Sequence, residues 1–134
     1  MSHFVRIKTR ITERQHLVAA LQALHLEYQA SEREDLVVGG FAGATERAEI
    51  VIATGTQYGI GLRRRDGCYE TVADWWGVQH GSLRQESFLQ QLHREYAHQT
   101  VLEYARQKES EGWTLEWEDR GDERVYELKE KISI

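Results

Sequence analysis

Residues 66–76 read DGCYETVADWW, and the interpretation of the whole chain starts from this stretch. Asp66-Gly67 is a strong signal for a two-residue hairpin turn, because such turns need residues that accept a positive φ. The residues after the turn predict a β-strand that leads to Asp74, directly before Trp75 and Trp76. Adjacent strand residues point to opposite faces, so we expect one tryptophan in the core and the other at the surface. Because a large exposed aromatic surface usually has a partner, this region is a candidate contact site.

Further strands are predicted on both sides of this segment. Residues 58–62 precede the turn as its partner strand, and residues 49–53 are apolar on both faces, which indicates a central strand. Residues 25–28 lead into a short predicted strand, and the glycines between 39 and 43 predict a flexible or sharply turned segment. Residues 3–11 alternate between apolar or threonine side chains and basic ones, which is typical of a half-buried strand. The side chains expected to face inward are those of Val5, Ile7, Thr9 and Ile11.

Two helices are predicted. The first follows a capping box of Thr12 and Gln15, and its leucines at 17, 21 and 24 form a stripe for the core. The second follows a similar box at Ser82 and runs to about Glu111, where Gly112 ends it. The apolar residues of this helix move to a different helical face between residues 92 and 101, which predicts a kink or two helices. Residues 113–118 and 125–129 then predict two strands, of which the first could pair its acidic face with the basic face of residues 3–11.

The predicted order is therefore β-α-β-β-β-β-α-β-β. We expect the α+β class, with an antiparallel β-sheet, two main helices packed on one face, and a single domain over residues 1–134. The chain contains no proline, which removes the commonest guard on edge strands. We therefore expect a sheet edge to be covered by a helix or by another subunit, so that a homo-oligomer could form through it.

Composition narrows the classes of function. The chain has 17 basic and 22 acidic residues and a net charge of −5, which makes nucleic acid an unlikely partner. No apolar run approaches the roughly 20 residues that span a bilayer, and the first residues do not resemble a signal peptide. The single cysteine, Cys68, cannot form an internal disulfide and fits a reducing compartment. We expect a soluble, cytoplasmic protein without a membrane association.

Several blocks of the sequence occur in an order that resembles one family. They are residues 1–9, 58–61, 69–74, 87–89 and 94–97. The chain resembles the family of hypothetical chloroplast reading frame thirty-five, a domain of unknown function in plastids, cyanobacteria and other bacteria. The resemblance spans residue 1 to about residue 128 and implies a bacterial cytoplasm or a plastid stroma as the location. The family has no established activity, cofactor or catalytic residue, so the resemblance assigns no functional residue here.

The candidate chemistry is limited. Asp74 must be paired if it is buried, and one of the arginines at 63–65 could supply the charge across the hairpin. In a strand, Arg63 and Arg65 share one face and could hold an anion, but a solvated strand end is the simpler interpretation. His93 and His98 are five residues apart and do not share a helix face, so they do not predict a metal site. Neither a metal, a cofactor nor a catalytic residue is predicted, and Cys68 is interpreted as structural.

Two functional hypotheses remain. The first is a non-catalytic interaction protein, an accessory or assembly factor with a protein partner, because aromatic residues gather at predicted surfaces without a catalytic constellation. The alternative is a small-molecule-binding domain or an enzyme with a pocket near Asp74. The candidate contact or ligand residues are Tyr69, Asp74, Trp75, Trp76, His80, Arg63, Arg65 and Tyr96.

Overall fold

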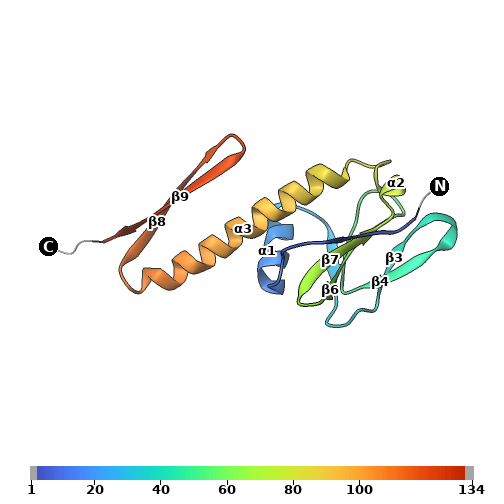
Figure 1. Cartoon of the computed structure of the whole chain (residues 1–134), viewed down its shortest axis with the longest axis horizontal. Helices are drawn as coiled ribbons and strands as arrows, with labels where there is room; N and C mark the ends of the chain where they lie inside the picture. Colours follow the sequence, from blue (N-terminus) through green and yellow to red (C-terminus); the bar gives the residue numbers. More distant parts are fainter. Residues whose placement is uncertain (1–2, 132–134) are drawn as a thin grey trace. The chain divides into compact units, whose positions relative to one another are not determined.

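The computed structural model describes residues 3–131 and has the predicted α+β fold (Figure 1). The chain divides into two compact units, Met1–Tyr96 and Ala97–Ile134. Each unit is described by itself below. Within residues 3–131, we find no helix with both the length and the apolar character needed to cross a membrane.

The first unit is built on a five-stranded antiparallel sheet. Its strands, in spatial order, are β1 (Val5–Lys8), β7 (Cys68–Ala73), β6 (Ile60–Arg65), β5 (Ile50–Ile52) and β2 (Tyr28–Ala30). The β6–β7 hairpin turns at Asp66 and Gly67, whose φ angles of 53° and 83° are both positive. A two-residue turn with two positive φ angles matches the right-handed twist of the strands, so the predicted hairpin is confirmed.

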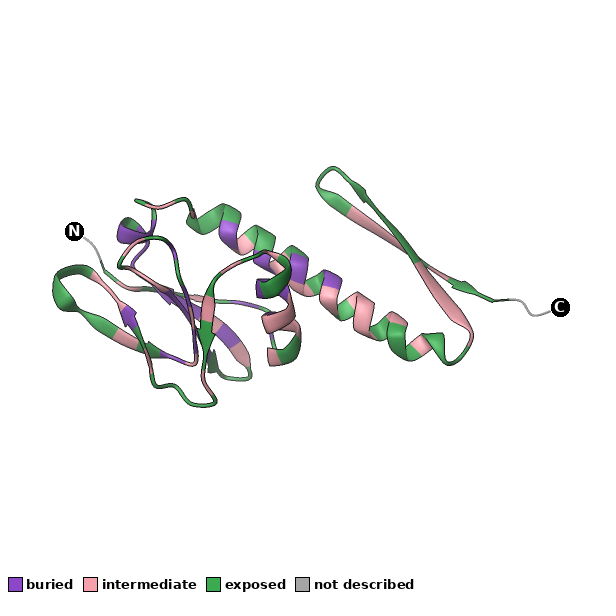
Figure 2. Cartoon of the chain, turned by 180° about the vertical axis from the view of Figure 1, so that it is seen from behind, coloured by how far each residue is buried: buried purple, intermediate pink, exposed green. Residues whose placement is uncertain are grey.

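Two helices cover one face of this sheet. α1 (Arg14–Ala23) buries Leu17 and Leu21 completely, as the leucine stripe predicted, while Leu24 is half-buried at the end of the helix. The first part of α3 (Gln85–Glu109) adds Phe88 and Leu92 to the same core. The buried segments in Figure 2 coincide with these helices and with the strands. The prediction of two main helices on one face of the sheet is confirmed.

The opposite face carries a hairpin that the sequence analysis did not predict. It consists of β3 (Leu36–Gly39), the short 3₁₀ helix η1 (Phe41–Gly43) and β4 (Thr45–Ala48). Val38 and Ala48 form a second core with Val72. Gly61 makes this close packing possible, because a Cβ atom there would lie 2.6 Å from the Val38 side chain. The sheet is thus buried between helices on one side and a hairpin on the other.

Two details at the start of the chain differ from the predictions. β1 ends at Lys8, and Val5 is 40% exposed because β1 lies at the edge of the sheet. The capping box at Thr12 is wrong: α1 begins at Arg14, and its N-cap residue, Glu13, makes no side-chain capping bond. Instead, the backbone N–H groups of Thr12 and Glu13 donate to the Tyr96 hydroxyl at 3.2 and 3.0 Å.

The second unit contains the rest of α3 and the antiparallel hairpin of β8 (Trp113–Arg120) and β9 (Glu123–Glu130). α3 is one continuous helix rather than two, and its shift in apolar phase falls near the boundary of the units. Both predicted strands are present. The pairing considered for residues 113–118 with the first strand does not occur, because β1 pairs with β7 and β8 pairs with β9.

Candidate functional site

The tryptophan pair lies in a helical turn. Residues Trp75–Val78 form α2, a four-residue helix directly after β7, although the tryptophans were expected to alternate as strand residues. Trp75 is 7% exposed and packs against Phe88 with ring centroids 6.0 Å apart, whereas Trp76 is 49% exposed. One tryptophan is therefore in the core and the other at the surface, as predicted. The cause is the rotation between successive residues of a helix and not the alternation of a strand.

An exposed aromatic patch forms around Trp76, and we define it by Phe41, Trp76 and His80. The rings of Phe41 and Trp76 meet edge to face with centroids 6.1 Å apart, and Phe41 is 48% exposed. His80 follows at the end of α2, with its ring 4.8 Å from that of Trp76. The patch thus joins two segments distant in sequence, the η1 turn of the β3–β4 hairpin and α2. Sequence analysis missed Phe41, because nothing local marks the turn as a neighbour of α2.

Asp74 fixes the position of one half of the patch. Its side chain is 1% exposed, and its Oδ2 accepts a hydrogen bond from the backbone N–H of Phe41 at 3.2 Å. This bond holds the η1 turn against the start of α2. Hydrogen bonds to charged groups contribute about 1.5–3 kcal/mol when they are protected from water. The carboxylate therefore joins two segments of the first unit at this point.

Two glycines allow tight packing beneath the patch. At Gly77 in α2, a Cβ atom would lie 2.4 Å from the ring of Tyr58. At Gly40, before the η1 turn, a Cβ atom would lie 2.5 Å from the ring of Phe4. Both backbone segments therefore rest directly on aromatic rings of the first unit. Such support limits the movement of the patch relative to the sheet.

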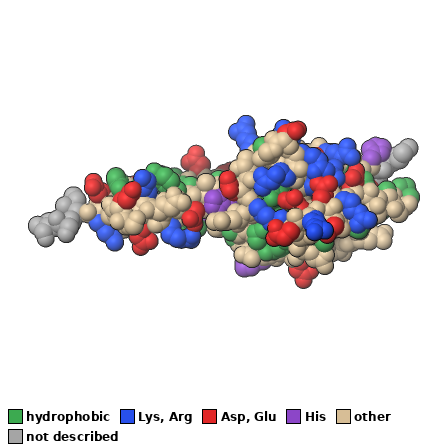
Figure 3. Space-filling view, turned by 90° about the horizontal axis from the view of Figure 1, so that it is seen from below, with side chains coloured by type: hydrophobic (Ala, Val, Ile, Leu, Met, Phe, Trp, Pro, Cys, Tyr) green, Lys and Arg blue, Asp and Glu red, His purple; other side chains and the backbone are tan. Residues whose placement is uncertain are grey.

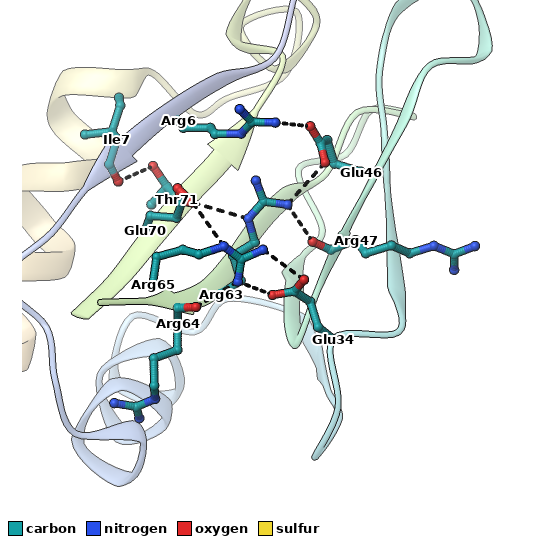
Figure 4. A network of polar contacts seen from close by, with 10 residues as sticks. All are labelled: Arg6, Ile7, Glu34, Glu46, Arg47, Arg63, Arg64, Arg65, Glu70 and Thr71. Carbon is teal, nitrogen blue, oxygen red and sulfur yellow. Dashed lines mark hydrogen bonds and ion pairs between the residues drawn. The ribbon is translucent and has the colours of Figure 1, made fainter. Parts of the chain in front are cut away.

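The predicted arginines lie elsewhere, on the hairpin-covered face of the sheet (Figure 4). Arg63 is 4% exposed, and it donates to Glu46 at 3.2 Å, to Glu70 at 3.4 Å and to the Arg47 carbonyl at 3.0 Å. In the register, Arg63 faces Glu70, which lies four residues before Asp74 in β7. Arg63 and Asp74 are therefore about 13 Å apart along the strand direction. The predicted charge pairing between Arg63 and Asp74 is therefore replaced by pairing with glutamates.

Arg65 shares this face with Arg63, as the strand period predicted, and forms an ion pair with Glu34. The hydrogen bond from Arg65 holds the pKa of Glu34 below its ordinary value, and the same bond raises the pKa of Arg65. Arg6 adds a further ion pair, with Glu46 at 2.7 Å. Basic and acidic side chains alternate over the first unit in Figure 3. The concavity of about 450 Å³ between these groups is lined by four arginines and three glutamates, and three of the arginines, Arg6, Arg63 and Arg65, pair with glutamates.

Tyr69 and Tyr96 lie together on the helix-covered face. Tyr69 is fully buried, and its hydroxyl accepts a hydrogen bond from Arg64 at 3.2 Å. Burial is the main cause that raises the pKa of Tyr69. Arg64 also donates a hydrogen bond to the Thr12 carbonyl at 2.9 Å. The N–H group of Thr12 donates to the Tyr96 hydroxyl. The candidate residues thus fall into three places: Asp74 with the tryptophans and His80, Arg63 with Arg65, and Tyr69 with Tyr96.

A further concavity involves none of the predicted residues. It has a volume of about 690 Å³ and lies beside the edge strand β2, with Tyr28, Val37, Val51 and Gln57 in its lining. Its lining residues come from β2, β3, β5 and the loops beside them, segments that are distant in the sequence. Within residues 3–131, no group of three His, Cys, Asp or Glu side chains is arranged to hold a metal ion.

Comparisons with known proteins give one family. The model of the family described as "Protein of unknown function (DUF1257)" matches residues 20–128. The "Uncharacterized protein ycf35" of Cyanophora paradoxa is 28% identical over 127 residues, which cover 93% of this chain and 94% of that protein. The "Uncharacterized protein ycf35" of Guillardia theta is 32% identical over 111 residues, with 78% and 79% covered. No solved structure matches significantly. The opening residues Met1 and Ser2 lie outside the described residues.

Proposed function

The chain belongs to the DUF1257 family of unknown function, and we propose that it is a non-catalytic interaction protein, an accessory or assembly factor. On this proposal it binds a protein partner through the exposed aromatic patch of Phe41, Trp76 and His80. The observation that carries the proposal is the exposure of two large adjacent rings, 48% for Phe41 and 49% for Trp76. A soluble domain usually buries such rings unless another molecule covers them.

The chemistry of the patch supports a protein partner. Tryptophan is enriched among the residues that dominate protein–protein binding, because one ring buries a large area and its N–H group can still find an acceptor. The imidazole of His80 beside Trp76 adds a polar group at the rim of the apolar surface. Apolar centres with polar rims are the usual composition of such interfaces.

The rigidity of the patch supports the proposal as well. The Asp74 carboxylate holds the Phe41 backbone, and Gly77 lies against Tyr58 below α2. A surface that is already ordered loses little conformational entropy when a partner binds, which improves affinity for a given area. We also propose that the partner is met in a bacterial cytoplasm or a plastid stroma.

The alternative of a small-molecule or enzyme site near Asp74 has weaker support. Asp74 accepts a backbone hydrogen bond at the base of the patch, and Arg63 and Arg65 pair with glutamates on the hairpin-covered face of the sheet. The residues proposed for that site therefore do not converge on one pocket, as ligand binding would need.

Affinity purification of the tagged full chain from its native cell tests the proposal, with Trp76→Ala as the test variant. Tyr104→Ala is the matched control, because Tyr104 is an equally exposed aromatic residue at 51%. We expect the wild type and Tyr104→Ala to recover the same partner at comparable yield, and Trp76→Ala to lose it. Unchanged circular dichroism of both variants is required. Recovery of the bare chain under mild conditions, or equal recovery with Trp76→Ala, would contradict the proposal.

A further inference from the structure

The second unit has little interior of its own. Among its described residues, 97–131, His98 is the one buried side chain, at 6% exposure, and the other residues are half-buried or exposed (Figure 2). Units of fewer than about 40 residues usually need a disulfide, a metal or a partner subunit to be stable. The single cysteine of the chain lies in the first unit, so a disulfide within the second is excluded. The two-stranded sheet of this unit needs further cover.

The outer edge of β9 offers backbone groups for a further strand. The Lys131 N–H donates to the Gly112 carbonyl at 2.6 Å, which continues the β8–β9 register beyond the strand ends. In an antiparallel pair, residues alternate between those that bond the partner strand and those that point their N–H and C=O groups away from it. The N–H and C=O groups of Tyr126 and Leu128 therefore point away from β8. No proline guards this edge, because the chain contains none.

The charges along β9 are complementary to those of a second β9. In antiparallel pairing centred on Tyr126, residues 123–129 overlap, and Glu123 of each copy lies opposite Lys129 of the other. A register centred on Val125 would set Glu123 against Glu127, and one centred on Glu127 would set two glutamates against each other. Opposite charges directly across a sheet stabilise the pairing and like charges destabilise it. A register centred on Leu128 also sets Glu127 against Lys129, but it overlaps over residues 126–130 alone. The register centred on Tyr126 is therefore the longest one within β9 that places no like charges opposite each other.

The β8 edge is a poorer candidate for self-pairing. Antiparallel registers centred on Glu116, Trp117 or Glu118 all place one glutamate opposite another. Lys129, in contrast, lies on the β9 side and already contacts Glu116 Oε2 at 2.9 Å. In the paired sheet this ammonium group would lie between Glu116 of its own chain and Glu123 of the second copy.

Pairing through β9 would also bring two helices together. The Tyr126 hydroxyl and His98 Nδ1 share a hydrogen bond of 2.8 Å, so this face of β9 is the one that α3 covers. In the paired sheet, the same faces of both hairpins lie on one side. Strands are about 4.8 Å apart, so the centres of two adjacent hairpins lie about 10 Å apart. This spacing is close to the 8–10 Å at which helices pack, so both helices can cover the four strands together.

We propose that two copies of this chain associate through the outer edges of β9 and form a four-stranded antiparallel sheet in the order β8-β9-β9-β8. The interface lies in the second unit and is independent of the aromatic patch. It extends a two-stranded sheet, which α3 covers on one face, to four strands.

Two proline variants test which edge is used. Leu115 and Leu128 face each other in the register and are both half-buried, but their N–H groups point to opposite edges of the hairpin. We expect the wild type and Leu115→Pro to form dimers in sedimentation velocity from micromolar to submillimolar concentration, and Leu128→Pro to stay monomeric. A wild type that is monomeric throughout this range would overturn the proposal. Dimers that persist in Leu128→Pro would overturn it too.

A charge exchange tests the register without placing proline in a strand. Lys129→Glu sets two carboxylates against each other at both ends of the interface, and we expect the dissociation constant to rise by about tenfold. The double variant Glu123→Lys with Lys129→Glu restores both opposite-charge pairs and is expected to recover the dimer. Failure of the double variant to associate better than Lys129→Glu would exclude the register centred on Tyr126.

Discussion

The five-stranded sheet of the first unit is covered on both faces, whereas the two-stranded sheet of the second unit has one face against a helix segment. In the first unit, helices α1 and α3 close one face and the β3–β4 hairpin closes the other. All the buried apolar side chains of residues 3–131 belong to this unit. The second unit relies on polar and aromatic contacts, such as the edge-to-face contact of His98 with Trp117. The difference separates a region that holds itself together from one that, on our proposal, is completed by association.

The sharpest test of this difference compares two leucines. Leu62 is fully buried in β6, and Leu62→Ala is expected to lower the free energy of unfolding by about 2–5 kcal/mol, because the cavity cannot collapse between two covered faces. Leu115 is half-buried in β8, and Leu115→Ala is expected to cost about 1 kcal/mol or less. Urea denaturation followed by circular dichroism measures both. Equal losses would remove the distinction between the two units.

A second comparison uses two arginines in ion pairs. The side chain of Arg63 is 5% exposed, and Arg63→Met would leave Glu46 and Glu70 without its guanidinium, at an expected cost of about 2–4 kcal/mol. Arg120 pairs with Glu118 in the second unit at 62% exposure, and Arg120→Met is expected to cost about 1 kcal/mol or less. Adding Glu46→Gln to Arg63→Met should recover part of the loss. Without such recovery, the effect of Arg63 would come from packing rather than from charge.

The smallest expected effect concerns pH. The hydrogen bond from Arg65 lowers the pKa of Glu34 from its ordinary 4.5. Burial alone would raise the pKa of Glu46, but hydrogen bonds from Arg6 and Arg63 outweigh it, so this pKa is lowered as well. Groups with a lowered pKa in the folded state stabilise the protein above about pH 4.5 and lose this contribution as the pH falls further. We expect Glu34→Gln to flatten the acid limb of stability measured by thermal unfolding between pH 3 and 6. An unchanged acid limb would show that this ion pair is too solvated to matter.

The features that could be predicted from the sequence are those determined locally. The turn at Asp66-Gly67 depends on two adjacent residues, and the shared face of Arg63 and Arg65 follows from the strand period alone. The α+β class followed from the periodicities of the longer elements. The β3–β4 hairpin was missed because its strands have four residues each and pack over Gly61, a neighbour only in the fold. Likewise, Glu46 pairs with Arg63 from β4, a separate segment that carries no local signal of this contact, whereas Glu70 lies opposite Arg63 in the predicted hairpin.

The candidate site shows the same limit. The exposure of one tryptophan could be predicted, but its contact with Phe41 depends on a turn 35 residues earlier in the chain. The capping of α1 was predicted from Thr12 and Gln15. In the structure, the N–H groups of Thr12 and Glu13 donate to the Tyr96 hydroxyl instead. Long-range contacts of this kind replace the local signal on which a sequence prediction depends.

The Tyr96 hydroxyl also has a consequence for the order in which the chain folds during synthesis. The N–H groups of Thr12 and Glu13 are 84 and 83 residues away from it, and β1 pairs with β7 across a similarly long stretch. A nascent chain therefore carries its first strand and helix without their native partners until most of the polypeptide has left the ribosome. Closing such long loops is slow, because the entropy of the intervening chain is lost before the contacts are gained. Until then, the amino-terminal segment stays accessible to chaperones.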